Sequence, residues 1–171
     1  EDDIGQAIDE TDGISLLVGE PSGGLVDVDL DSPEAIAVAP YLLPQTGLLS
    51  GRRKNPNSHW WYQLSDPKLA KTEKFAIRQK SGGKTTGSVM FLEIRGTGSC
   101  TTVFPSLHPD DDQYEWMSYG DPATVDRRSL SIAATKVAIA AVLARYWPGH
   151  GVRHEASLPI AGFFARANWP E

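Results

Sequence analysis

The segment GLVDVDLDSPEA, residues 24–35, alternates apolar and acidic side chains. Successive side chains of a strand point to opposite faces, so this alternation predicts a buried strand with one apolar and one acidic face. Three carboxyl groups share the acidic face: Asp27, Asp29 and Asp31. Ser32 then suits an N-cap, which predicts a helix directly after the strand.

Three like charges at this spacing repel one another and cost stability unless a cation lies among them. We therefore expect a divalent-metal site at the carboxyl end of a central strand. One of the three carboxyl groups could instead cap a turn and take no part in chemistry.

The bulk composition limits the class of protein. The chain has 171 residues, 40% hydrophobic content and a net charge of −6. This length predicts one domain, or one domain and a fragment, and the start at Glu1 without Met predicts a piece of a larger protein. No apolar run reaches the ~20 residues of a membrane span, so we expect no membrane partner. The single Cys100 excludes an internal disulfide and a cysteine-based zinc site, and it favours a cytoplasmic location.

The charge is unevenly distributed along the chain. Residues 1–50 carry eleven acidic and no basic residues, whereas residues 51–84 carry nine Lys and Arg against two acids. A basic segment directly after an acidic strand predicts a phosphate-binding surface beside metal carboxylates. A solvated basic loop is the alternative interpretation.

The remaining patterns predict an α/β (α+β) fold, with a mixed sheet, helices on one face and a C-terminal helical extension. Asn55–Asn57 suits a turn between two strands, and residues 81–87 suit a loop. Pro40 is expected to shorten the first helix. A long helix is expected at residues 127–147 with Ser129 as its cap, and a later helical stretch is expected to break or restart at Pro159.

Three further features carry chemistry. His59 begins the aromatic strand in NSHWWY, and Glu93 lies inside the apolar strand FLEIRG with Arg95 two residues later on the same face. Arg52 belongs to a basic turn. His59 could be a satisfied core histidine, and Glu93 could simply pair with Arg95 on a solvent-facing side. Together with the acidic strand, however, they are the residue types that a two-metal site requires: carboxyl groups for the metals and basic side chains to bind phosphate groups.

The segment SGGKTTG contains the GKT of a phosphate-binding P-loop. That motif needs a glycine five positions before Gly83, and the residue there is Arg78. We therefore reject a P-loop.

The motifs occur in the order GEPSGGLVDVDLDSPEA, GRRKNPNSHWWY and LEIRGTGSCTTVFPSLHPDDDQYEW. In this order they resemble the bifunctional primase–polymerase (prim-pol) domain of phage and plasmid replication proteins, in the archaeo-eukaryotic primase superfamily. The resemblance spans about residues 13–117. It rests on an acid-x-acid strand, a small-x-His strand and a hydrophobic-acid strand, followed by a PSLHP loop. It implies an RRM-like catalytic core that joins nucleotides on a DNA template.

The resemblance also implies roles for residues. In relatives a hydrophobic run precedes the acid pair, which aligns that pair with Asp29 and Asp31 and makes Asp27 an extra carboxyl group. His59 matches a histidine that contacts the incoming triphosphate, and Glu93 stands where aspartate is commoner. The implied metals are Mg²⁺ or Mn²⁺, with these ligands: Asp29, Asp31, Glu93 and, as a further candidate, Asp27. The implied catalytic residues are Asp29, Asp31, Glu93 and His59.

The expected contacts to the nucleotide are His59, Arg52, Arg95 and Ser58. The expected contacts to DNA are Arg53, Lys54, Lys71, Lys74, Lys80 and Lys84. We expect residues 1–126 to form the catalytic domain. Residues 127–171 are expected to form a helical extension that leads to a helicase region in the full-length chain.

The expected function is template-directed nucleotidyl transfer by a DNA primase and polymerase. Its partners would be a single-stranded DNA template and NTPs or dNTPs, in the cytoplasm of a bacterium or phage-infected cell. A metal-dependent nuclease or phosphoesterase would use the same carboxylates without needing a triphosphate grip. An inactive single-strand nucleic-acid-binding module is a third possibility, against which the intact carboxylates in all three motifs argue.

Overall fold

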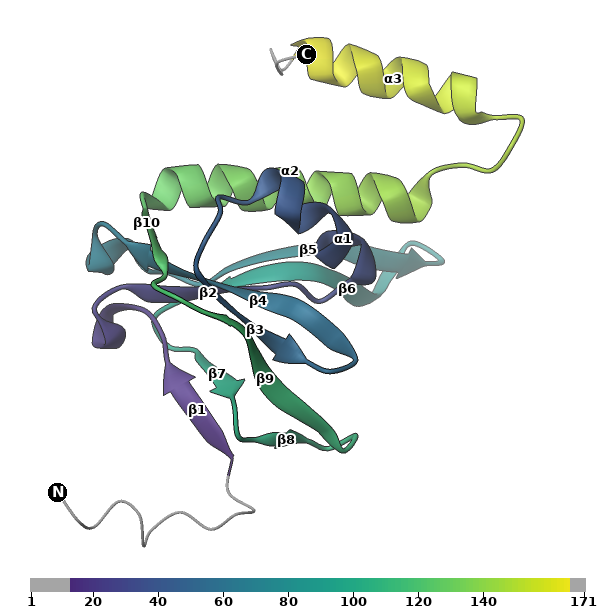
Figure 1. Cartoon of the computed structure of the whole chain (residues 1–171). Helices are drawn as coiled ribbons and strands as arrows, with labels where there is room; N and C mark the ends of the chain where they lie inside the picture. The colour runs from purple at the N-terminus through teal and green to yellow at the C-terminus, as the bar shows by residue number, and fades with distance from the viewer. Residues whose placement is uncertain (1–12, 167–171) are drawn as a thin grey trace, which may run out of the picture.

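The computed structural model describes residues 13–166 and has a mixed α and β architecture, as the sequence predicts (Figure 1). The strands are β1 (Ile14–Leu17), β2 (Leu25–Asp29), β3 (Leu48–Arg52), β4 (Asn55–Leu64), β5 (Glu73–Ser81), β6 (Lys84–Arg95), β7 (Cys100–Val103), β8 (Leu107–His108), β9 (Asp112–Tyr119) and β10 (Ala123–Val125). The helices are α1 (Pro33–Leu42), α2 (Arg127–Tyr146) and α3 (Arg153–Arg166), with short 3-10 turns η2 (Glu20–Ser22) and η3 (Pro67–Leu69).

The strands form one large and one small sheet. The large sheet has the order β5-β6-β2-β4-β3-β9-β8, and its neighbours pair antiparallel. β10 adds a short parallel pairing to the end of β4, which makes the sheet mixed. β1 and β7 pair with each other as a separate antiparallel ribbon. The acidic strand β2 therefore lies in the interior of the large sheet, between β4 and β6.

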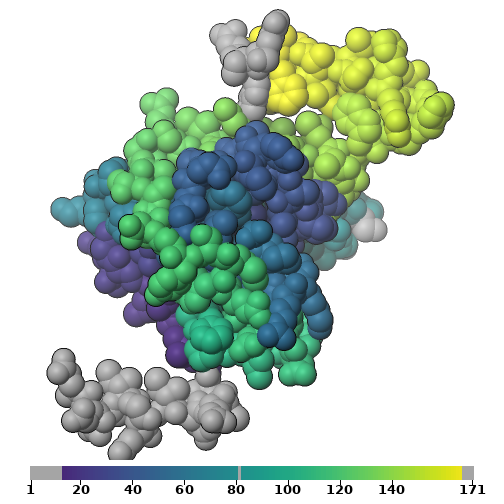
Figure 2. All heavy atoms as spheres, viewed as in Figure 1, coloured from purple at the N-terminus to yellow at the C-terminus, as the bar shows by residue number. Residues whose placement is uncertain are grey.

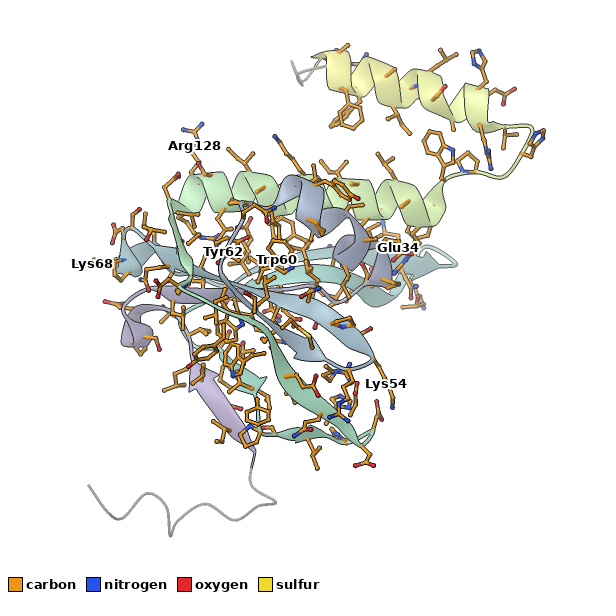
Figure 3. The ribbon with its side chains drawn as sticks, viewed as in Figure 1. Glu34, Lys54, Trp60, Tyr62, Lys68 and Arg128 are labelled. Atoms are coloured by element: carbon orange, nitrogen blue, oxygen red, sulfur yellow. The ribbon has the colours of Figure 1, made fainter. Side chains whose placement is uncertain are left out.

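The two helices α1 and α2 cover one face of the large sheet (Figure 1). The apolar residues of β2 that alternate with the acids, Val26 and Val28, are fully buried beneath them. Figure 3 shows Trp60 and Tyr62 directed from β4 toward the same helices. This face holds the main core, because helix burial and strand alternation direct the apolar side chains to the same layer.

The opposite face is covered only in part, by the ribbon of β1 and β7. A second apolar cluster forms there around Val18, Trp61 and Val103. The indole N–H of Trp61 donates to the Ser50 hydroxyl, at 2.9 Å. The charged side chains of β2 lie on this face, beside the second cluster.

Two turns differ from the sequence prediction. The predicted turn at Asn55–Asn57 is wrong, because β4 already begins at Asn55 and pairs with Arg52. Asn57 has a φ of 57°, in the left-handed region that asparagine tolerates. The β3–β4 register shifts between Ser50 and Arg52, so Asn57 belongs to a bulge-like irregularity within the strand pair. Gly51 is required there, because a Cβ would lie 2.5 Å from the Asn55 carbonyl oxygen.

The predicted loop over residues 81–87 is also wrong. β5 and β6 pair through Ser81 and Lys84, which leaves a turn of two residues. Gly82 and Gly83 both have positive φ, 58° and 78°. A two-residue turn of this kind matches the twist of antiparallel strands, so the glycines join a long ribbon.

Both internal prolines are tolerated in helices. α1 continues to Leu42, beyond Pro40, and α3 runs without interruption through Pro159. Each proline removes one backbone hydrogen bond, and each lies on an exposed side of its helix, where water can satisfy the carbonyl oxygen. The predictions that these prolines shorten or break the helices are therefore wrong.

The long helix predicted at residues 127–147 is confirmed as α2. By length and composition α2 could cross a membrane, with a mean hydropathy of 1.3 over its most apolar window. Its buried side chains belong to the core of the large sheet, which is the behaviour of a core helix: Leu130, Ala133, Ala134, Val137 and Ala141. The predicted domain boundary at residue 126 stays a prediction.

Helix α1 is fastened to the end of α2. Arg145 pairs with Glu34 through two hydrogen bonds, one of them 3.0 Å long from Nε, and its guanidinium lies 4.6 Å above the Phe91 ring. α3 contributes no buried residue and projects from the rest of the described chain (Figure 2).

The cap of α2 gives a test of this fold. Asp126 is the N-cap and accepts from the Ser129 amide at 2.9 Å, so the prediction of Ser129 as the cap is wrong. We expect Asp126→Ala to lower the free energy of unfolding by about 1 kcal/mol. Ser129→Ala should cost less than half as much, because the amide donor remains. Chemical denaturation of both variants measures the difference, and equal costs would contradict the assignment.

Candidate functional site

Strand pairing places the acidic residue Asp29 between two chemically active neighbours. Asp29 lies directly opposite His59 of β4 and directly opposite Glu93 of β6. Residues opposite each other in antiparallel strands point to the same face, about 5 Å apart. A histidine and two carboxyl groups from three strands therefore meet on the face that α1 and α2 leave open.

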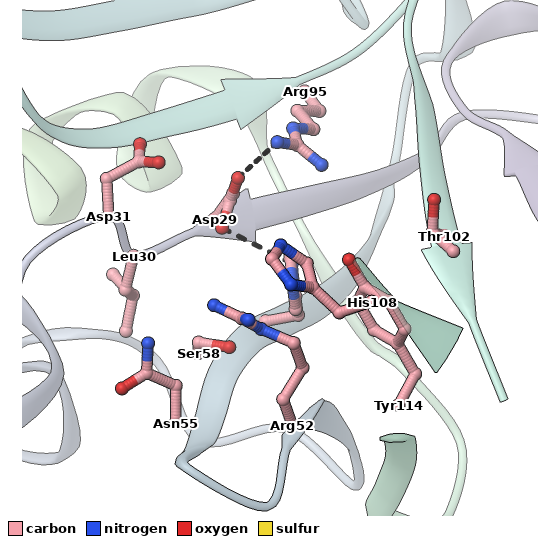
Figure 4. A pocket seen from close by; sticks show the side chains of 11 residues that line it. Asp29, Leu30, Asp31, Arg52, Asn55, Ser58, Arg95, Thr102, His108 and Tyr114 are labelled. Atoms are coloured by element: carbon pink, nitrogen blue, oxygen red, sulfur yellow. Dashed lines mark ion pairs between the residues drawn. The ribbon is translucent and has the colours of Figure 1, made fainter. Parts of the chain in front are cut away.

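A pocket of about 360 Å³ opens at this position (Figure 4). It brings together six of the residues that the sequence singled out: Asp29, Asp31, Arg52, Ser58, His59 and Arg95. Five further residues complete its wall: Leu30, Asn55, Thr102, His108 and Tyr114. Strands β2, β3, β4, β6, β7, β8 and β9, with the residues after β2, supply this lining.

Asp29 lies at the centre of the charges in the pocket (Figure 4). Its carboxyl group forms a close ion pair with the Arg95 guanidinium and lies 3.5 Å from His59 Nδ1. The pKa of Asp29 is raised to about 7, mainly by burial and also by the carboxyl groups of Asp27 and Asp31, although His59 and Arg95 act in the opposite direction. The pKa of Asp31 is also raised, mainly by burial. Negative charge is thus costly here without a cation.

His59 is buried and held by hydrogen bonding. Its Nδ1 lies 2.9 Å from Asp27 Oδ2. Burial alone would lower the pKa of His59, but the carboxyl groups of Asp27 and Asp29 outweigh it and the pKa is raised. A protonated imidazole at the pocket wall can donate to an anionic ligand.

Arg95 bridges the acids of two strands. Besides Asp29, its Nε lies 3.8 Å from Glu93 Oε2, and Lys74 Nζ lies 3.6 Å from Glu93 Oε1. Glu93 is therefore next to the pocket without lining it, and two basic groups neutralise it. Arg52, on the opposite wall, lies 3.8 Å from the buried Asp112.

Asp27 lies away from the pocket surface. It is fully buried, and its Oδ2 also accepts from the Thr101 hydroxyl at 2.8 Å. The sequence placed Asp27 with Asp29 and Asp31 on one acidic face. Asp31 instead lies just beyond the end of β2 and is more exposed than Asp29, so only Asp27 and Asp29 share the strand face.

The residues predicted to contact DNA are exposed and lie outside the pocket. Arg53, in the turn between β3 and β4, pairs with Glu115 of β9, and Lys54 is in the same turn (Figure 3). The other four lie on or just before the ribbon of β5 and β6: Lys71, Lys74, Lys80 and Lys84.

The sequence missed several pocket residues. His108 lies in the PSLHP loop, and Tyr114 follows it on β9. The centroids of their two rings are 6.4 Å apart. The PSLHP loop supports the family resemblance, but nothing in its sequence indicates that His108 lines the pocket. Asn55 and Thr102 carry no motif signal, because only the strand register brings them to the pocket.

The carboxyl groups of the site are suitable ligands for a divalent metal, although their side chains do not converge on one ion position in this structure. Across residues 13–166, no three His, Cys, Asp or Glu side chains converge on a single ion position. Arg95 occupies the space between Asp29 and Glu93, and Asp27 is turned toward Thr101. Carboxylate oxygens are the ligands that Mg²⁺ and Mn²⁺ prefer, and the raised pKa of Asp29 marks a place where added positive charge would be stabilised.

A comparison with models of protein families shows the family to which the chain belongs. The model of the bifunctional DNA primase/polymerase N-terminal domain matches residues 5–128. The chain belongs to this family. The match contains all the strands and the whole pocket, and it confirms the resemblance inferred from the three motifs. Searches of curated proteins and of solved structures found no match.

The raised pKa of Asp29 predicts a pH dependence of stability for this prim-pol domain. A carboxyl group whose folded pKa is about 7 binds a proton more tightly in the folded state than in the unfolded chain, where its pKa is 3.8. The contribution of Asp29 to the free energy of unfolding is therefore fully present below about pH 4 and is lost as the pH rises toward 7.

We expect Asp29→Asn to remove this loss. In chelator-treated protein, the free energy of unfolding of the variant minus that of the wild type should be larger at pH 8 than at pH 5, by roughly 1 kcal/mol or more. Denaturation by urea at the two pH values measures the gain. A constant difference between the two proteins would contradict the raised pKa.

Proposed function

We propose that this domain is a template-directed nucleotidyltransferase that joins NTPs or dNTPs on single-stranded DNA. One observation carries the proposal: the acid pair Asp29 and Asp31 and the motif histidine His59 line one pocket with two arginines. Glu93 lies directly beside that pocket. Carboxylates alone would suit many metal-dependent reactions. Carboxylates beside several phosphate-binding cations suit a reaction in which a triphosphate is bound and then cleaved.

The cations of the pocket would hold the triphosphate. His59, Arg52 and Arg95 lie on three different strands around the pocket, so their donors approach a bound anion from separate directions. Hydrogen bonds between charged donors and phosphate oxygens are short and strong, and arginine can donate two in parallel. Arg95 would exchange its partner Asp29 for a phosphate group.

The carboxyl groups would hold the metal ions. Asp29, Asp31 and Glu93 are the proposed ligands of Mg²⁺ or Mn²⁺, which would activate the attacking hydroxyl and neutralise the leaving pyrophosphate. When Arg95 moves to the nucleotide, Asp29 and Glu93 lose the guanidinium that now lies near both. Release of the arginine and binding of a cation are therefore coupled by charge.

The exposed basic residues would follow the template backbone. Lys74 and Arg78 alternate along β5 with Phe75 and Ile77, which pack against the core under the helices. Lys74 and Arg78 therefore lie on the same side of the sheet as the pocket. Lys80 and Lys84 lie near the tip of the ribbon. Such contacts are sensitive to salt and insensitive to sequence. A helicase region in a longer chain and a role in phage or plasmid replication in the cytoplasm also belong to this proposal.

A nuclease or phosphoesterase is the competing function. It would use the same carboxyl groups but would not need free nucleoside triphosphates. Binding of a free triphosphate through His59 therefore separates the two functions.

The carboxyl groups give the first test of the proposal. Asp29→Ala, Asp31→Ala and Glu93→Ala should each reduce incorporation of labelled nucleotide by at least about a hundredfold, since each removes a metal ligand. Asp121→Ala, an exposed acid outside the pocket, is the matched control and should keep wild-type activity. Near-normal activity of Asp31→Ala would contradict the assignment of Asp29 and Asp31 as the acid pair.

His59 gives the second test. A charge-assisted hydrogen bond contributes about 1.5–3 kcal/mol, so His59→Ala should weaken nucleotide binding by about ten- to hundredfold while DNA binding survives. Calorimetric titration of triphosphate and Mg²⁺ into the protein measures this change. His150→Ala, an exposed histidine before α3, should bind like the wild type. Absence of binding to the wild type would overturn the proposed function.

A further inference from the structure

Asp27 is a buried carboxyl group without a role in the acid pair. It is fully buried on β2, and its Oδ2 accepts from both His59 Nδ1, at 2.9 Å, and Thr101 Oγ1, at 2.8 Å. Its Oδ1 is buried without a hydrogen-bond partner in the described structure. Burying a carboxyl group with one oxygen unsatisfied costs stability. Such a residue needs a reason that packing does not provide.

Metal binding is a poor reason. Asp27 does not line the pocket that contains Asp29 and Asp31, and its bonded oxygen is already shared between two donors. Thr101 belongs to β7, in the separate two-stranded ribbon, and is itself fully buried. The hydroxyl therefore fixes the carboxyl group from the side opposite the large sheet.

The contact that matters is the one to His59. With Nδ1 bonded to Asp27, the ring has one orientation, and Nε2 is the nitrogen left for a ligand at the pocket wall. The next acceptor for Nδ1 is Asp29 Oδ1, 3.5 Å away. Without Asp27, the imidazole would turn to Asp29 and occupy an oxygen that the proposed metal needs.

We infer that Asp27 is a positioning residue, which with Thr101 orients His59 toward a phosphate group of the nucleotide and keeps it off Asp29. The inference rests on the proposed function for the identity of the ligand. The orientation of His59 by Asp27 is independent of that function and can be measured separately.

The binding experiment titrates ATP and dATP, each with Mg²⁺ and without template, into five proteins: the wild type, Asp27→Val, Asp27→Asn, His59→Ala and Asp27→Val with His59→Ala. Asp27→Val should weaken binding about tenfold, which corresponds to ~1.4 kcal/mol. Asp27→Asn, whose side-chain oxygen still accepts from both donors, should change binding less than about threefold. In a His59→Ala background, Asp27→Val should have no further effect, because its only route to the nucleotide is gone.

Two further variants separate positioning from unfolding. Asp27→Val with Thr101→Val replaces the buried pair by two apolar residues of similar volume, so it should fold while binding as weakly as Asp27→Val. Thr135→Val in α2 is the control for the threonine change and lies on the other face of the sheet. Weakening by Asp27→Val that is equally large in the His59→Ala background would overturn the inference and favour a direct role in binding metal.

Nuclear magnetic resonance reads the orientation without any nucleotide. The Nδ1 proton of His59, protected by its bond to Asp27, should resonate at nearly the same position in the wild type and in Asp27→Asn. In Asp27→Val it should shift or be lost, because its acceptor becomes Asp29. An unchanged His59 signal in Asp27→Val would overturn the inference. A shifted or lost signal in Asp27→Val, with no nucleotide binding by any of the proteins, would keep the positioning of His59 and refute the proposed function.

Discussion

The antiparallel pairing of β2 with both β4 and β6 is the constraint on which the site depends. It sets Asp29 opposite His59 on one side and opposite Glu93 on the other. Strand side chains repeat every two residues, so a shift of one position would bury the carboxyl groups beneath the helices and expose the valines. The apolar core under α1 and α2 therefore fixes the chemistry on the opposite face, because it holds the register.

The cost of this arrangement is electrostatic. Several acids meet at one end of a central strand, and burial raises the pKa of Asp29 to about 7. Arg95 and His59 relieve the repulsion as long as no other cation is present. A site whose own basic groups neutralise its acids can release those groups to an anionic ligand when a metal takes their place. Under the proposed function, this exchange would let the same few residues hold both metal and phosphate.

Much of the fold and part of the site could be predicted from the sequence. The alternation in β2, the N-cap Ser32 and the periodicity of α2 are local signals, and local signals predict elements well. The order of the three motifs also predicted the family. The prediction that Pro40 shortens its helix fails because the proline lies on an exposed side of α1, where water can replace the lost hydrogen bond. The loop predicted around Gly82 is instead a two-residue hairpin turn, of which paired glycines are a local signal. Thr101 could not be found, because its contact with Asp27 joins residues 74 positions apart on different sheets.

The central claim is that this pocket transfers nucleotides in the order that a template specifies. The most direct measurement supplies homopolymer single strands, a short primer, Mg²⁺ or Mn²⁺ and each labelled nucleotide in turn, with primer-free reactions beside them. The account predicts products that contain only the nucleotide complementary to the template. Strand cleavage without incorporation, or incorporation that ignores the template, would contradict it.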